Sequence, residues 1–88
     1  MANKESAKKR YRQMLKRRAR NRTHRSSLRT AIKQLREAIA NNDAQKASEL
    51  LPSTLGLVDA TAQKGVIHRN AASRTKSRLA RAVAGLQA

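Results

Sequence analysis

The first thirty-six residues of the chain carry fourteen Lys and Arg side chains and a single acidic residue, Glu5. Between Lys16 and Ser27 the only apolar residue is Ala19, so this stretch has almost nothing to bury in a protein core. Cations at this density repel one another unless a polyanion neutralises them, and a nucleic-acid backbone does so while releasing its condensed counterions. The segment is therefore predicted to find its partner outside the protein. Its cations are Lys4, Lys8, Lys9, Arg10, Arg12, Lys16, Arg17, Arg18, Arg20, Arg22, Arg25, Arg29, Lys33 and Arg36.

The sequence of 88 residues is short enough for one domain, and its formal net charge is +16. A chain of this size buries only a small core, and Tyr11 is its only aromatic residue. Because there is no Cys, stability must come from helix packing and from whatever the chain binds. We expect a single domain over residues 1–88, with a basic extension over 1–27 and a helical bundle over 28–88.

Apolar residues at helical spacing predict that the basic segment continues into a packed helix. Leu28, Ile32, Leu35 and Ile39 fall within one narrow sector of a helix. Followed back towards the N-terminus, the same side becomes mostly polar and basic. The pattern predicts one long helix over about residues 6–40, whose C-terminal third packs and whose N-terminal part projects.

A second helix is predicted to follow a short turn. Asn41 and Asn42 suit that turn, and Asp43 is a good N-cap. Pro52 lies inside the helical pattern, where it costs about 3 kcal/mol, so a kink near Leu51 or a stop and restart is expected. The expected apolar stripe is Ala47, Leu51, Leu55, Val58 and Ala62.

A third helix is predicted over about residues 67–86, after Gly65 ends the second in a left-handed conformation and Val66 makes the accompanying apolar contact. Its inner side would carry Ala72, Thr75, Leu79, Val83 and Leu86, and its outer side Asn70, Arg74, Ser77, Arg78 and Arg81. No segment alternates convincingly with the period of a strand. The predicted fold is all-α, a three-helix antiparallel bundle with a long, basic, projecting N-terminal helix.

Several functional classes are disfavoured. No apolar run is long enough to cross a membrane, and the basic start meets no apolar segment of a secretory signal. A transit peptide is also Arg-rich, but here the basic stretch runs unbroken into the helix expected to form the core. There is no thiol nucleophile or glycine-rich phosphate loop, and His24 and His68 lie on different elements without a metal-ligand cluster. We expect no enzymatic activity, no cofactor and no metal.

Cations occupy every side of the expected helix over residues 8–25. A solvated surface helix would intersperse Glu, and a membrane-surface helix would oppose its basic side with large apolar residues. Cations on all sides are typical of a helix enclosed by phosphates of more than one strand, as in folded RNA. One alternative is a disordered, solvated tail. Another is a nucleoid-type double-stranded DNA-binding protein, expected to show a dimer interface or a minor-groove wedge.

Three smaller features of the sequence are each compatible with a role in binding and with a purely structural interpretation. The outer stripe of Arg74, Arg78 and Arg81 either contacts phosphates or faces solvent. Tyr11 either stacks on a base or a sugar, or it packs against the protein or is simply exposed. His68, beside a basic helix start, either meets a phosphate or base or is an ordinary surface histidine.

Two segments carry a specific resemblance: the opening MANKESAKKR, residues 1–10, and KGVIHRNAASR, residues 64–74. With these motifs, and over essentially its full length, the chain resembles the bacterial small-subunit ribosomal protein family numbered twenty. The resemblance implies a three-helix bundle with a long N-terminal helix. It also implies a protein that binds small-subunit ribosomal RNA of the 16S type directly and stabilises its folded helices during assembly.

The resemblance further implies a place on the ribosome in the cytoplasm, with other small-subunit proteins as neighbours only, no membrane partner and no obligate homo-oligomer. Together with the charge pattern it yields eighteen candidate RNA-binding residues. These are Lys4, Lys8, Lys9, Arg10, Arg12, Lys16, Arg17, Arg18, Arg20, Arg22, Arg25, Arg29, Lys64, His68, Arg69, Asn70, Arg74 and Arg78.

Overall fold

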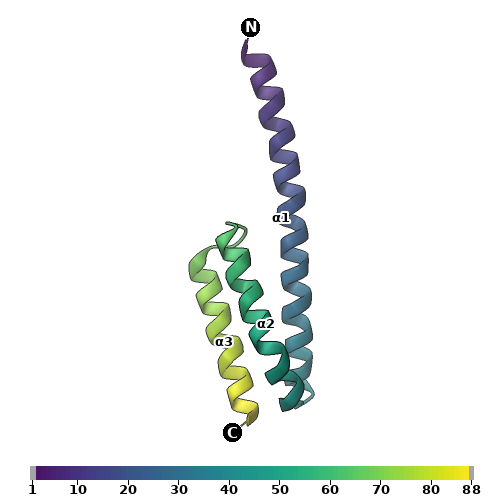
Figure 1. Cartoon of the computed structure of the whole chain (residues 1–88), viewed down its shortest axis with the longest axis vertical. Helices are drawn as coiled ribbons and strands as arrows, with labels where there is room; N and C mark the ends of the chain where they lie inside the picture. The colour runs from purple at the N-terminus through teal and green to yellow at the C-terminus, as the bar shows by residue number, and fades with distance from the viewer. Residues whose placement is uncertain (1, 88) are drawn as a thin grey trace.

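Three helices make up the chain in a computed structural model that describes the backbone of residues 2–87 and the side chains of residues 4–86. They are α1 (Ala2–Ala40), α2 (Ala44–Gln63) and α3 (Arg69–Gln87). Successive helices run antiparallel, and α1 extends far beyond the other two (Figure 1). Within the described range there is no strand. The predicted all-α fold with a long, projecting first helix is confirmed.

The long helix α1 begins four residues earlier than predicted, at Ala2 rather than near Ser6. Glu5 lies in its first turn, where a carboxylate interacts favourably with the positive end of the helix dipole. The helix contains 39 residues and accounts for most of the 66 Å length of the molecule. The basic segment is therefore carried on a continuous helical rod.

The turn between α1 and α2 is fixed by backbone geometry at both helix ends. Asn42 adopts the left-handed conformation with φ 56°, and its N–H donates to the carbonyl of Ile39. The Asp43 N–H donates to the carbonyl of Ala38, which completes the C-terminal cap of α1. The Asp43 carboxylate then accepts from the Lys46 N–H at 3.1 Å and caps α2, as predicted.

Replacing Asp43 with Ala should destabilise the bundle by about 1 kcal/mol, because the Lys46 N–H at the start of α2 loses its side-chain acceptor. Thermal or urea unfolding of the variant against the parent measures the loss. Asp43→Ser is the matched control, since a hydroxyl can take over the acceptor role. An Ala variant as stable as the parent would show that the cap contributes nothing.

The second helix passes through Pro52 without a break, so the alternative in which it stops and restarts there is wrong. The kinked alternative stays a prediction. The buried residues of α2 are also not the predicted apolar stripe. Leu51, Leu55 and Ala62 are only half-buried, whereas the buried residues are Ala47, Thr54, Val58 and Thr61.

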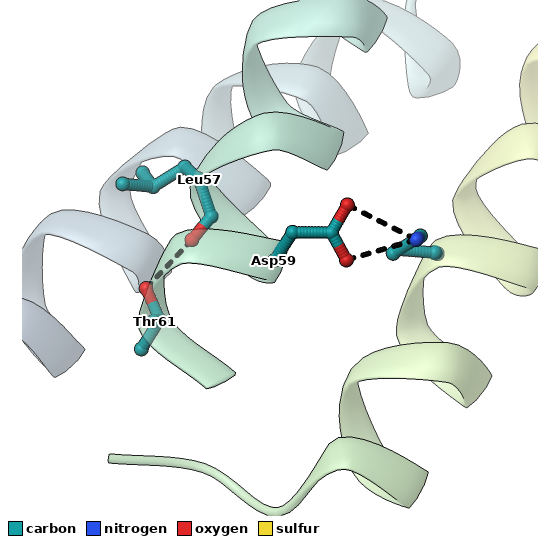
Figure 2. A network of polar contacts seen from close by, with 4 residues as sticks. Leu57, Asp59 and Thr61 are labelled. Atoms are coloured by element: carbon teal, nitrogen blue, oxygen red, sulfur yellow. Dashed lines mark hydrogen bonds and ion pairs between the residues drawn. The ribbon is translucent and has the colours of Figure 1, made fainter. Parts of the chain in front are cut away.

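The two buried threonines satisfy their own hydroxyls. Thr54 donates to the carbonyl of Leu50 at 2.8 Å, and Thr61 donates to the carbonyl of Leu57 at 2.7 Å. The second of these bonds is drawn in Figure 2. Each hydroxyl uses a carbonyl one turn earlier in the same helix, so the threonine presents its methyl group to the core at little polar cost.

The turn between α2 and α3 repeats the geometry of the first turn. Gly65 has φ 75°, its N–H donates to Ala62, and the Val66 N–H donates to Thr61. Val66 is buried, as the predicted apolar contact requires. The start of α3 differs from the prediction, because the helix begins at Arg69 rather than near Ile67. His68 precedes it and caps it.

The core consists of two clusters that share a half-buried residue, Ile32, which packs against both. The first cluster joins all three helices through Leu35, Ala38, Ala47, Leu79 and Val83. The second lies nearer the α2–α3 turn and contains Leu28, Val58 and Ala72. The predicted packing sides of α1 and α3 are thus confirmed, and residues 4–27 contribute no buried side chain.

One ion pair links α2 to α3. The ammonium of Lys76 donates to both carboxylate oxygens of Asp59, at 2.8 and 3.1 Å. Figure 2 shows the Asp59 carboxylate reaching across to the neighbouring helix. The Asp59 side chain is well exposed and that of Lys76 is partly exposed, so water screens the pair and its contribution to stability is small.

Candidate nucleic-acid interface

The projecting part of α1 is exposed on all sides. Every residue from 4 to 20 is exposed, including the apolar side chains of Tyr11, Met14 and Leu15. Ala, Gln, Met, Leu, Lys and Arg are good helix formers, which suits a helix without tertiary support. Further along, Thr23 donates to the carbonyl of Ala19 at 3.1 Å, and its hydroxyl is satisfied within the helix.

The cations of this rod border hollows on more than one of its sides. One hollow of about 360 Å³ is lined by Arg18, Arg22, Arg25 and Arg29, which we call the arginine face of α1. A second, also about 360 Å³, lies among Gln13, Lys16, Arg17 and Arg20. A third lies among Lys9, Arg12, Gln13 and Lys16. Anions could therefore approach the helix from several directions at once.

The remaining candidate residues lie at the turn between α2 and α3 and on the exposed side of α3. Lys64 is the C-cap of α2, and Arg69 and Asn70 begin α3. The turn between these helices lies at the end of the bundle from which α1 projects (Figure 1). Arg74 and Arg78 continue the exposed side of α3. The second group of cations therefore stands beside the base of the projecting rod.

His68 has a structural role that sequence reasoning did not predict. Its Nδ1 accepts a hydrogen bond from the Asn70 N–H at 3.1 Å, and its carbonyl accepts from the Ala72 N–H. An accepting Nδ1 carries no proton, so in this geometry the donor of the neutral ring is Nε2. Since the side chain is exposed, this second nitrogen remains available for an outside partner.

All eighteen candidate residues are exposed, and the fold places them in the two groups just described. Two of these candidates line a hollow that also contains an acid: Arg69 with Asp59, and Arg29 with Glu37. Two exposed cations outside the candidate set, Lys33 and Arg36, lie further along the same side as the arginine face. Lys33 follows Arg29 by four residues, and Arg36 follows Lys33 by three. This helical spacing is the sequence signal that could have identified both residues.

Other kinds of site find no support in the described part of the chain. Among these residues no group of three His, Cys, Asp or Glu could hold a metal ion. No helix among the same residues has the length and hydropathy needed to cross a membrane. The geometry thus leaves an exposed, basic helical surface as the feature that requires a partner.

A family model described as ribosomal protein S20 matches residues 2–84, which include all of α1 and α2 and most of α3. The chain belongs to the ribosomal protein S20 family. This membership confirms the resemblance seen in the two sequence motifs, and it agrees with the prediction that the chain is not an enzyme.

Curated relatives of the S20 family match the chain from end to end. Proteins named small ribosomal subunit protein bS20 from Burkholderia cenocepacia and Burkholderia vietnamiensis are each 48% identical to it over 88 residues. The protein of that name from Burkholderia multivorans shows the same 48% identity. In each case the match covers 100% of this chain and 98% of the relative.

Proposed function

We propose that the chain is a structural component of the small ribosomal subunit that binds 16S-type ribosomal RNA directly and stabilises its folded helices during assembly. The observation that carries this proposal is the exposed α1 rod, whose cations lie on all sides and which buries nothing over residues 4–20. Its relatives carry the name of a small-subunit protein, which supports the same subunit here.

The proposed interface has two parts that act together. The rod of α1 inserts between RNA helices, and its Lys and Arg side chains reduce the repulsion between phosphates of neighbouring strands. The group around the α2–α3 turn, with Lys64 and Arg69, holds the RNA at the base of the rod. The bundle acts as the rigid support, and other small-subunit proteins are neighbours rather than obligate partners.

Membership in a ribosomal protein family favours this proposal over the nucleoid-type DNA-binding alternative. A competition experiment separates the two. Labelled small-subunit ribosomal RNA is bound to the protein and challenged with unlabelled RNA or with a DNA duplex of equal phosphate content. We expect the RNA to compete far better. Equal competition by the DNA duplex would contradict the proposal.

Free protein and RNA complex should differ in amide exchange over residues 4–24. Lys8, Arg12, Lys16 and Arg20 follow one another at i,i+4 spacing, where like charges destabilise a helix. Because no tertiary contact offsets this, the segment should open readily and exchange fast in the free protein at low salt. RNA phosphates remove the repulsion, so exchange should slow strongly on binding.

Residues 28–86 provide the internal control, because their helices pack against one another in both states. Their exchange should change little when RNA is added. Slow exchange over residues 10–20 in the free, low-salt protein would show that the rod is stable by itself and would rule out this coupling.

A further inference from the structure

An open groove of about 500 Å³ lies between α1 and α3, beyond residues 4–20 of the projecting helix. From α3 it is lined by Thr75, and from α1 by Arg29, Ile32, Lys33, Arg36, Glu37 and Ala40, so three cations and one acid border it. Ile32 and Thr75 are half-buried, whereas the three cations are exposed. The groove therefore has an apolar floor and a basic rim, and it has the size of an ordinary small-ligand site.

The basic rim is continuous with the arginine face of α1. Arg29 lines both the groove and the hollow formed by Arg18, Arg22 and Arg25. Steps of three and four residues place successive cations about 4.5–6 Å apart along the helix axis. A strand of phosphates that follows the arginine face thus reaches the groove with a cation at each step of three or four residues along α1.

We propose that this groove binds one unpaired nucleotide of the ribosomal RNA, with the base on Ile32 and Thr75 and the flanking phosphates on Lys33 and Arg36. The inference rests on the proposed function and deepens it, since it names the kind of RNA element bound by the bundle. Neither Lys33 nor Arg36 belongs to the candidate residues identified from sequence.

The chemistry of the groove suits an unpaired nucleotide better than a duplex. A base that is splayed out of a helix can place its flat face on apolar side chains or on a guanidinium plane, which a base within a duplex cannot do. The neighbouring phosphates form charge-assisted hydrogen bonds to the cations of the rim. Glu37 also lines the groove, and its carboxylate can accept from an exocyclic amino group of the base.

Site-specific crosslinking tests the occupant directly, because the chain contains no Cys. The variant Thr75→Cys carries a photoactivatable group in the groove and is bound to deproteinised small-subunit ribosomal RNA and, separately, assembled into small subunits. Glu49→Cys, at an exposed position of α2, is the matched control. Ala40→Cys, exposed at the groove lining, is a second reporter if Thr75→Cys folds poorly.

We expect the groove reporters to crosslink to the same one or two nucleotides, which reagents for unpaired RNA modify less once the protein binds. The control should not crosslink there. A groove reporter that crosslinks to another protein of the subunit, or to a base-paired stretch, would overturn the proposal, and so would one that does not crosslink at all.

A salt titration gives an independent measurement. Lys33→Gln with Arg36→Gln should lower the slope of log affinity against log salt by about 1.5 to 2, because two phosphate contacts are lost. Lys46→Gln with Lys76→Gln removes the same charge away from the groove and should leave the slope unchanged. Equal slopes in the two double variants would overturn the groove proposal while binding itself persists. No RNA binding by the parent protein would instead overturn the proposed function.

Discussion

The affinity of the chain for small-subunit ribosomal RNA should fall about a thousandfold as salt rises from about 50 to about 200 mM, if six or more phosphates are contacted. Each phosphate contact releases condensed counterions, and the entropy gained by their release is smaller in concentrated salt. The binding affinity therefore falls by a further factor for each phosphate contacted. The exposed rod of α1 alone offers more than six cations. Equilibrium binding at several salt concentrations measures the slope.

A matched pair of single variants tests whether the slope arises at the rod. Arg17→Gln should lower it by about one, because one phosphate contact is lost. Lys46→Gln removes the same charge from α2, far from the rod, and should not change it. A nearly flat dependence in the parent protein would mean that hydrogen bonds and apolar contacts, rather than phosphate neutralisation, dominate the binding.

Most of the fold follows from short-range chemistry that is visible in the sequence. Leu28, Leu35 and their neighbours identified the packing side of α1 by spacing alone. Asp43 and Gly65 marked helix ends because few other residues accept those hydrogen bonds or that conformation as readily. Where the residue type itself determines the local structure, the prediction and the structure agree.

The errors arise where a residue behaves differently from its class. Thr54 and Thr61 lie outside the apolar stripe predicted for α2, yet each hydroxyl is satisfied within the helix and leaves a methyl group to pack. The start of α3 was placed too early because His68 is not among the usual N-cap residues. Its Nδ1 nevertheless accepts a hydrogen bond from the Asn70 N–H, as an N-cap side chain does. Neither outcome can be decided without the surrounding backbone.

The sequence predicted an exposed, basic interface but not all the residues that belong to it. Every candidate cation is exposed, as binding requires, because a dense basic segment has nothing to bury. Lys33 and Arg36 were counted among the cations of the basic segment but not among the eighteen candidates. The groove beside them exists only because α3 lies next to α1, and that placement depends on packing across all three helices.

Replacing Leu35 with Ala should destabilise the bundle by about 2–5 kcal/mol. Leu35 is 0% exposed and packs in the cluster that joins all three helices, so the lost methyl groups leave a cavity between α1, α2 and α3. A domain of this size is stable by only about 5–10 kcal/mol, so much of its stability would be lost. Thermal unfolding should show a melting temperature lower by about 4–8 °C for each kcal/mol.

The matched control replaces Arg17, Arg18, Arg20 and Arg22 with Gln. All four side chains are exposed on the rod and none touches the core, so the melting temperature should stay close to that of the parent. Affinity for the RNA should fall strongly in this variant, whereas folded Leu35→Ala protein should bind nearly as well as the parent at low temperature. This opposite pattern follows from a chain in which one end of α1 holds the fold together and the other end has no partner within the protein. An equal loss of melting temperature in both variants would mean that the basic segment packs on the bundle after all.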